Sequence, residues 1–200
     1  EIKLKDYKYG VAFDGDGDRA IFVSSDYGAI QTEKIMFLFF KMLKERYKNN
    51  ILVTTEVCNL ALKHNIEDQG GTLIETEVGD RFVVNETTNK AALFGAEPSG
   101  HFYFPEISNA MDGLIALLYF LQLLEFYGSR FNAELLSIKH YQRIQKNIRL
   151  DQIKALNLDH IMKNISLLIN SQKEKIILRQ SMWDPVLRVN HAYQKENTFY

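Results

Sequence analysis

The sequence has a single cysteine, Cys58, among its 200 residues. One cysteine cannot form an intramolecular disulfide, and no apolar N-terminal stretch with a basic flank and a cleavage site is visible. Both absences favour a reducing, cytoplasmic setting. The formal net charge is only -1, so no overall positive field attracts nucleic acid or an anionic membrane. We therefore expect neither partner, and any anionic ligand must be held by a local cluster of basic groups.

Long hydrophobic runs are also missing. The most apolar stretches, at residues 35–40 and 114–124, are well short of the roughly 20 residues that span a bilayer, and they are predicted to be core-facing helices. A hydrophobic fraction of 46% with 24% charged residues is typical of folded globular proteins and argues against disorder. The chain starts without methionine, and its polar opening runs directly into an apolar strand. We expect it to be a piece of a longer protein.

Strand and helix patterns alternate through the first two thirds of the chain. Strands are predicted at residues 11–13, 21–24, 51–54, 72–78, 92–96 and 101–104, and helices at 32–48, 59–69, 81–90 and 112–127. This order predicts an α/β fold with a mixed, largely parallel sheet and flanking helices. After Gly128 and Ser129 the pattern changes to a short helix, a strand at 141–148, a helical region through 169, and strands at 175–178 and 186–191. These elements predict a small α+β domain.

An acidic loop follows the first strand and places Asp14, Asp16 and Asp18 on alternate residues, separated by glycines. Without a cation, three such charges would repel one another. Mg²⁺ is a hard ion that prefers oxygen ligands, so the loop is a candidate magnesium site.

Other interpretations of this loop are a solvated acidic turn, a calcium loop and a phosphatase site. The calcium loop fails, because an EF-hand needs Gly at its sixth position and Glu at its twelfth, where Arg19 and Ser25 stand. The phosphatase alternative would make Asp14 a nucleophile that accepts phosphate, after an apolar strand ending in Asp-x-Asp.

A second loop, at residues 95–101, carries Glu97, Ser99 and His101 between two predicted strands. A carboxylate that accepts two hydroxyl hydrogen bonds is suited to reading vicinal sugar hydroxyls. His101 could contact substrate or assist proton transfer, since histidine titrates near neutral pH. The alternatives are an ordinary turn for the loop and a structural role for His101.

The string Gly10-Val-Ala-Phe-Asp-Gly-Asp-Gly-Asp-Arg19 resembles the metal loop of the α-D-phosphohexomutases, which include phosphoglucomutases, phosphomannomutases and phosphoglucosamine mutases. The resemblance implies that Asp14, Asp16 and Asp18 bind Mg²⁺ together with a phosphoserine oxygen, and that Arg19 faces the active site.

Two further segments carry the same resemblance. Residues 95–101 resemble the family's sugar-binding loop, which implies that Glu97 and Ser99 contact the hexose. Residues 78–81 resemble another family segment, which implies substrate contacts from Asp80 and Arg81. Related sequences often carry a basic residue where this chain has Glu77, so we expect no basic contribution from that point.

A third family loop grips the phosphate that is not reacting, and its counterpart here runs from Arg179 to Arg188. Arg179, Ser181 and Arg188 match the family pattern, as does Pro185, and guanidinium groups suit phosphate contacts. Met182 and Trp183 replace a small Gly and a hydroxyl-bearing Thr, which removes a donor and adds bulk.

The resemblance implies three regions: residues 1–31 as the end of a second domain with the metal loop, 32–128 as an α/β third domain with the sugar loop, and 129–200 as an α+β fourth domain with the phosphate loop. It implies an isomerase that moves phosphate between C1 and C6 of a hexose phosphate, with Mg²⁺ as cofactor. We expect Arg19 and His101 to be its catalytic residues in this chain. The family's phosphoserine loop has no counterpart in these residues. We therefore expect the missing N-terminal domains of the same protein as a partner, and an inactive chain on its own. A non-catalytic sugar-phosphate-binding module is the alternative.

Overall fold

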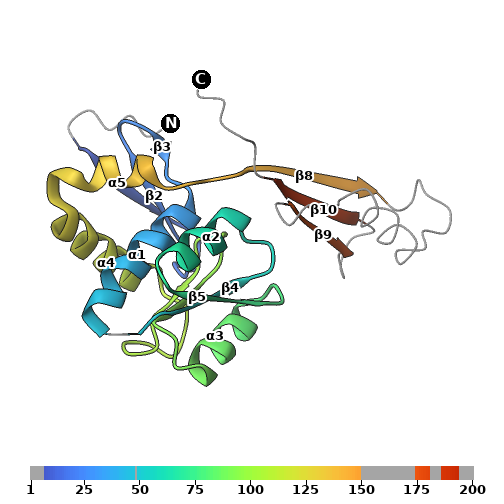
Figure 1. Ribbon diagram of the computed structural model, residues 1–200, viewed down its shortest axis with the longest axis horizontal. Coiled ribbons are helices and arrows are strands. Elements are labelled where there is room, and N and C mark those ends of the chain that lie inside the picture. The colour runs from blue at the N-terminus through green and yellow to red at the C-terminus, as the bar shows by residue number, and fades with distance from the viewer. Residues whose placement is uncertain (1–6, 48, 150–173, 181–185, 194–200) are drawn as a thin grey trace. The chain divides into compact units, whose positions relative to one another are not determined.

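The computed structural model describes residues 7–47, 49–149, 174–180 and 186–193, with side chains described as far as Tyr141 (Figure 1). The chain divides into two compact units, one of Glu1–Cys58 with Leu62–Lys139 and the other of Asn59–Ala61 with His140–Tyr200. The first unit contains the predicted metal and sugar loops. The second contains the predicted phosphate loop.

The first unit begins with a small antiparallel sheet in the order β1-β2-β3. Strands β1 (Tyr9–Phe13) and β2 (Ala20–Ser24) are paired from Tyr9 opposite Ser24 to Phe13 opposite Ala20, and the acidic loop joins them. Strand β3 (Gly28–Ala29) adds a two-residue edge that the sequence did not predict. The acidic loop is thus the tip of a hairpin.

A four-stranded mixed sheet forms the rest of the unit, in the order β5-β4-β6-β7. The central strand β4 (Ile51–Thr55) pairs in parallel with both β5 (Thr72–Thr76) and β6 (Phe94–Ala96). Strand β7 (Phe102–Tyr103) returns antiparallel to β6, so the 97–101 loop is also a hairpin tip. The predicted mixed, largely parallel sheet is confirmed, although β5, β6 and β7 are shorter than expected.

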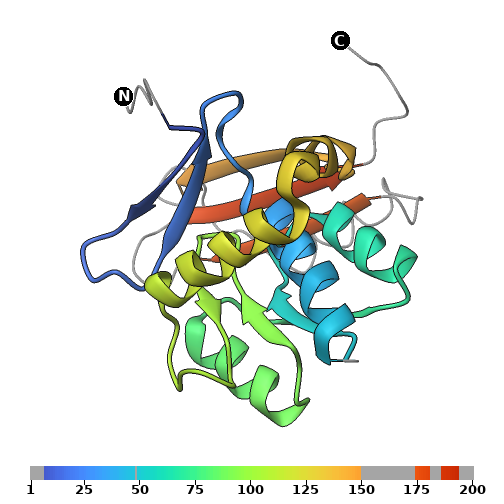
Figure 2. The same ribbon diagram turned by 90° about the vertical axis from the view of Figure 1, so that its left-hand side faces the viewer.

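Helices cover both faces of this sheet. Figures 1 and 2 show α1 (Thr32–Tyr47) and α2 (Leu60–Asp68) on one side and α3 (Asp80–Asn89) on the other. The apolar positions of α1 form the centre of the core, where Ile35, Met36, Phe39 and Phe40 are fully buried. The apolar run at residues 35–40 is therefore buried in the core, whereas the run at 114–124 faces the core on one side only and leaves Leu114, Leu118 and Leu121 exposed.

Helix α4 (Gly113–Tyr127) links the two sheets of the unit. Asp112 caps it by accepting hydrogen bonds from the amides of Leu114 and Ile115. From the buried face of α4, Phe120 stacks on Phe22 of β2 with ring centroids 4.2 Å apart, and Tyr119 stacks on Phe104 at 3.9 Å. The middle of α4 is thereby packed against β2 and against the residue that follows β7.

A 3-10 turn (Gly128–Arg130) and helix α5 (Phe131–Ser137) continue from α4. Within the described residues, the continuous stretch Gly113–Ser137 has the length and apolar composition of a membrane-crossing helix. One face of α4 contributes Ala116, Phe120 and Leu123 to the core. The expected lack of a membrane partner stays a prediction.

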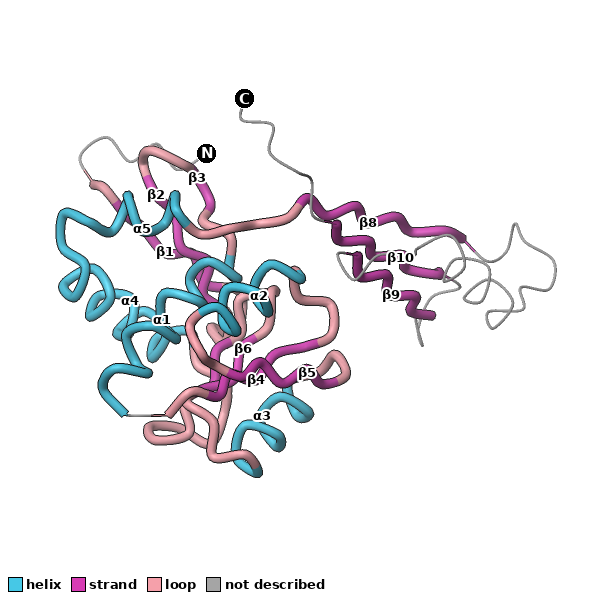
Figure 3. Tube along the Cα trace, in the orientation of Figure 1, coloured by secondary structure: helices cyan, strands magenta, loops and turns pink. Residues whose placement is uncertain are grey.

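In the second unit, the described strands form an antiparallel sheet in the order β8-β10-β9, shown as magenta tube in Figure 3. They are β8 (Gln142–Arg149), β9 (Glu174–Gln180) and β10 (Val186–Tyr193). All three predicted strands are present. The predicted helical region through residue 169 falls largely outside the described residues.

Candidate functional site

The acidic loop brings its three carboxylates together. One oxygen from each of Asp14, Asp16 and Asp18 lies within 4.8 Å of the others. Asp14 and Asp16 are exposed, whereas Asp18 is half-buried, and its Oδ1 atom is buried without a hydrogen-bond partner among the described residues. Three hard oxygen donors, one of them desolvated and unsatisfied, fit a divalent cation such as Mg²⁺.

Arg19 closes this loop from its C-terminal end. Its backbone N–H donates to Asp14 Oδ1 at 3.3 Å, and its Nε lies 3.3 Å from Asp14 Oδ2. Desolvation raises the pKa of Asp14, but the Arg19 amide and guanidinium together outweigh it and hold that pKa below its ordinary value. Asp14 therefore stays ionised to a lower pH than an ordinary aspartate.

The sugar-loop residues form a connected polar group. Glu97 Oε2 accepts from Ser99 Oγ at 3.1 Å and lies 2.7 Å from His101 Nδ1, while Glu97 Oε1 accepts from the Gly79 amide at 3.2 Å. Burial raises the pKa of Glu97, yet these donors outweigh it, so the pKa lies below its ordinary value. A carboxylate offers about four acceptor positions, and three protein donors leave roughly one for a ligand.

His101 joins the two loops. Its Nε2 lies 3.1 Å from Asp18 Oδ2 and 3.0 Å from the Nε of Arg19. Nε2 can accept from Arg19 only when the ring is neutral, and it can donate to Asp18 only when it is protonated. The hydrogen bond to Glu97 is the main reason that the pKa of His101 is raised, and Asp18 adds to it against the opposing effects of burial and Arg19.

Two glycines hold the hairpin tips in place, and sequence reasoning missed both. Gly100 has a φ of +99°, and its carbonyl accepts from the Ala20 amide at 2.9 Å. Gly113 donates its amide to Gly17 O at 3.1 Å, and an added Cβ there would lie 2.7 Å from Gly17 O and 2.8 Å from Arg19 O. The first residue of α4 thus rests directly on the acidic loop.

The remaining predicted contacts of this unit lie at the start of α3. The Gly79 amide bonds to Glu97, so Asp80 and Arg81 follow immediately after a residue that contacts the sugar loop. Both side chains are exposed. Asp80 Oδ1 accepts from the Arg81 amide at 2.7 Å, and the Arg81 guanidinium lies 4.6 Å from the centre of the Phe82 ring.

The predicted phosphate loop lies in the second unit and is described separately. Arg179 of β9 and Arg188 of β10 are direct partners in the antiparallel register. Ser181, Met182 and Trp183 lie outside the described residues. The backbone therefore places the two arginines opposite each other on neighbouring strands.

Comparison with known proteins supplies the context for these loops. Residues 31–141 match the family model for "Phosphoglucomutase/phosphomannomutase, alpha/beta/alpha domain III". The chain is 31% identical over 193 residues to a phosphoglucosamine mutase of Geobacillus thermodenitrificans, covering 94% of this chain and 43% of that protein. A phosphoglucosamine mutase of Thermotoga maritima is 30% identical over 189 residues, covering 94% and 44%.

Solved structures share the fold. A phosphoglucomutase/phosphomannomutase family protein of Burkholderia thailandensis superposes with a TM-score of 0.78 at 19% identity, covering 97% of this chain and 44% of that one. The N-acetylphosphoglucosamine mutase of Aspergillus fumigatus, solved with GlcNAc-6P and magnesium, gives a TM-score of 0.70 at 15% identity, covering 92% and 48%. The chain spans less than half the length of these proteins.

Proposed function

The chain belongs to the α-D-phosphohexomutase superfamily, and from that membership we propose that it is the C-terminal part of a mutase that moves phosphate between C1 and C6 of a hexosamine phosphate. The observation that carries the proposal is the contact of His101 with both Asp18 and Glu97. It joins a cluster suited to a metal ion to a carboxylate suited to sugar hydroxyls, which is the combination that a sugar-phosphate substrate requires. The amino sugar is proposed because the relatives that are 30% or more identical to the chain, reported above, are phosphoglucosamine mutases.

The acidic loop is the metal site in this proposal. Asp14, Asp16 and Asp18 would hold Mg²⁺, which supplies positive charge against a transferring phosphoryl group when it is bound. Arg19 keeps Asp14 ionised and adds a second positive charge on the side of the loop that contacts His101. Both features favour a dianionic ligand over a neutral one.

The 97–101 loop reads the sugar. Ser99 is exposed and Glu97 is buried, so the serine hydroxyl can turn from the carboxylate toward a ligand and leave Glu97 with two open acceptor positions. Two such positions match two neighbouring ring hydroxyls. His101, held through Nδ1 by Glu97, presents Nε2 to the metal loop and positions both groups.

Phosphate contacts come from basic groups outside these two loops. Arg81, at the exposed start of α3, follows Gly79 in contact with Glu97, and Asp80 orients the first turn of that helix. Arg179, Ser181 and Arg188 are proposed to hold the phosphate that does not react, because guanidinium pairs favour bidentate phosphate binding.

A second candidate is a sugar-phosphate-binding module without catalysis. It is favoured by Met182 and Trp183, which stand where the family loop has small and hydroxyl-bearing residues. Phosphate affinity would fall, or the ligand would bind in another pose.

Isothermal titration of the 200-residue chain tests the proposal in two steps. Mg²⁺ is titrated first, and then glucosamine 1-phosphate, glucose 1-phosphate and mannose 1-phosphate are titrated into the Mg²⁺-saturated chain. We expect Asp16→Asn to weaken Mg²⁺ binding and Arg179→Ala to weaken the binding of all three sugar phosphates, with glucosamine 1-phosphate bound most tightly by the parent chain. No Mg²⁺ binding by the parent chain would contradict the proposal.

Turnover separates the two candidates when the chain is assayed together with the N-terminal domains of the same protein, because the chain is expected to be inactive on its own. Conversion of glucosamine 1-phosphate, followed by ³¹P NMR with a catalytic amount of a hexose bisphosphate, would exclude a module that only binds. A stable phosphate attached to Asp14 would instead support the phosphatase alternative.

A further inference from the structure

A cavity lies at the edge of the four-stranded sheet opposite the loops described above. It is bordered by Asn49, which precedes β4, by Leu93, which precedes β6, and by Phe104, which follows the antiparallel strand β7. These are the amino ends of the parallel strands, whereas Glu97 follows the carboxyl end of β6. The cavity is therefore separate from the proposed active site.

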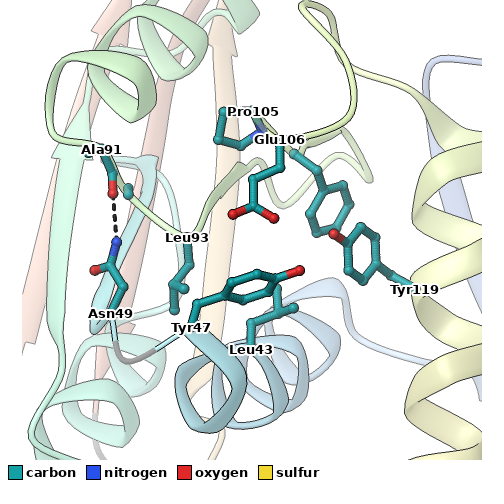
Figure 4. A pocket seen from close by; sticks show the side chains of 10 residues that line it. Leu43, Tyr47, Asn49, Ala91, Leu93, Pro105, Glu106 and Tyr119 are labelled. Atoms are coloured by element: carbon teal, nitrogen blue, oxygen red, sulfur yellow. Dashed lines mark hydrogen bonds between the residues drawn. The ribbon is translucent and has the colours of Figure 1, made fainter.

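The cavity is small and mostly apolar. Its volume is about 340 Å³, and its floor is formed by Leu43, Phe104 and Tyr119, which are only 1%, 2% and 4% exposed. Phe104 and Tyr119 are stacked on each other, and the ring of Tyr47 lies on the α1 side (Figure 4). Three aromatic rings thus line a space large enough for a compact organic group.

One formal charge belongs to the lining. Glu106 is the charged residue among the described lining residues, and Figure 4 shows its carboxylate directed toward Tyr47. Burial raises the pKa of Tyr47, and the nearby Glu106 carboxylate raises it further. Burial, with Tyr47 and Glu106 nearby, raises the pKa of Tyr119 to about 12, so both phenols stay protonated and add no charge of their own.

The charged groups beside the cavity also favour a cationic ligand. The neighbouring groove on α1 and α4 carries Glu45 and Glu125 with one guanidinium, Arg46. The Arg46 guanidinium lies 5.3 Å from the centre of the Tyr47 ring, within the range of a cation–π contact. Among the residues that line the cavity and this groove, three carboxylates stand against one guanidinium.

We propose that the cavity is a binding site for a small organic ammonium ion, with its apolar part against Phe104 and Tyr119 and its positive nitrogen beside Glu106 and the ring of Tyr47. Aromatic faces and a carboxylate attract an ammonium group together, while the aliphatic wall favours its carbon substituents over water. An anion would be repelled by the Glu106 carboxylate. A hydrated metal ion would have to give up water ligands, and the apolar wall offers nothing to replace them. This site requires neither the metal loop nor the sugar loop.

The test uses tetramethylammonium chloride as the probe and tert-butanol as a neutral probe of nearly the same shape. The full chain, carrying ¹³C-labelled tyrosine, is titrated in EDTA at constant ionic strength, and the ring resonances of Tyr47 and Tyr119 are followed by NMR. We expect saturable shifts with tetramethylammonium and at least about tenfold weaker binding of tert-butanol.

Two variants sharpen the test. Glu106→Gln keeps the shape and removes the charge, and it should weaken the tetramethylammonium affinity about tenfold. The matched control, Glu86→Gln, removes a carboxylate from α3, where Glu86 pairs with Lys90, and should leave the affinity unchanged. Equal binding of both probes, an unchanged affinity in Glu106→Gln, or no saturable shift would each overturn the proposal.

Discussion

The loops at residues 14–19 and 97–101 are both hairpin tips that present carboxylates, but the carboxylates differ in burial and in the number of protein donors that they accept from. In the acidic loop, Asp16 is exposed and Asp18 keeps a buried oxygen atom without a partner among the described residues. In the other loop, Glu97 is buried and accepts from three protein donors. The carboxylates of the acidic loop therefore lack enough hydrogen-bond donors and positive charges, whereas Glu97 has three protein donors.

The difference indicates what each loop needs from a ligand. A cluster that lacks counter-charge gains most from a cation, and its geometry depends on that cation. A carboxylate already held by protein donors is rigid without a ligand, so it can select a hydroxyl pattern at little entropic cost. Four predictions follow from this contrast, in order of decreasing effect.

Removing one charge from the acidic loop has the largest expected effect. Asp18→Asn removes the negative charge and replaces one of the two carboxylate oxygens by an amide group, either the unpaired oxygen or the one that faces His101. Mg²⁺ affinity should therefore fall about a hundredfold by isothermal titration. The control is Glu67→Gln, an exposed carboxylate on α2. Unchanged affinity in Asp18→Asn would show that the cluster does not bind the ion.

The second largest effect is expected from a substitution that displaces the acidic loop by steric contact. Gly113→Ala places a methyl group 2.7 Å from Gly17 O and 2.8 Å from Arg19 O, so the loop must move. We expect Mg²⁺ affinity to fall about tenfold and the free energy of unfolding to fall by about 1–3 kcal/mol. Leu114→Ala, at an exposed neighbour in the same helical turn, should change neither quantity appreciably. A normal affinity in Gly113→Ala would mean that the loop tolerates the displacement.

The third prediction concerns pH and the sugar loop without metal. Because the folded pKa of His101 is raised above 6.5, its contribution to stability is fully present below that value and is lost as the pH rises through the raised pKa. Because the folded pKa of Glu97 is lowered below 4.5, its contribution is present above that value and is lost as the pH falls through the lowered pKa. The pair should stabilise most between these limits.

Urea unfolding in EDTA at about pH 6 and about pH 9 measures the His101 contribution. We expect a loss of about 1 kcal/mol at the higher pH, since the neutral ring still donates Nδ1–H to Glu97. In Glu97→Gln this difference should shrink. His101→Gln gives the pH dependence that comes from all other groups. If the parent chain shows no further loss of stability at the higher pH than this variant, the raised pKa of His101 is contradicted.

The smallest effect is expected for Ser99→Ala. The hydroxyl is exposed and Glu97 keeps two other donors, so the free energy of unfolding should change by less than about 0.5 kcal/mol. If Ser99 contacts the sugar, affinity for glucosamine 1-phosphate should fall while Mg²⁺ affinity is kept. A large loss of stability would show that Glu97 depends on this serine.

Much of the fold could be predicted because the helices have local sequence signals, namely capping residues and periodic apolar positions. Asp112 is a typical N-cap residue that precedes a long apolar run, which predicts the start of α4. The periodic apolar residues of α1 predict which face of that helix is buried. The short strands were harder, since β6 and β7 are delimited by pairing partners rather than by composition. The two-residue strand β3 depends entirely on its pairing with β2.

The site residues were predicted by spacing and resemblance, but their connections were not. The contact between Arg19 and His101 spans 82 positions and exists only because two hairpin tips meet. Gly113 gave no signal of its own, because a glycine at the start of a helix is unremarkable until a neighbouring backbone is known. The Arg179–Arg188 opposition required the register of β9 and β10.

The Arg19–His101–Asp18 contact has a consequence for binding energetics. The imidazole can satisfy Asp18 or accept from Arg19, and the same ring holds Glu97, so occupancy of one loop changes the partners available to the other. By thermodynamic linkage, whatever factor a cation imposes on sugar affinity, the sugar must impose equally on cation affinity. Cation and sugar affinities measured separately on this chain therefore cannot simply be added to give the affinity for both.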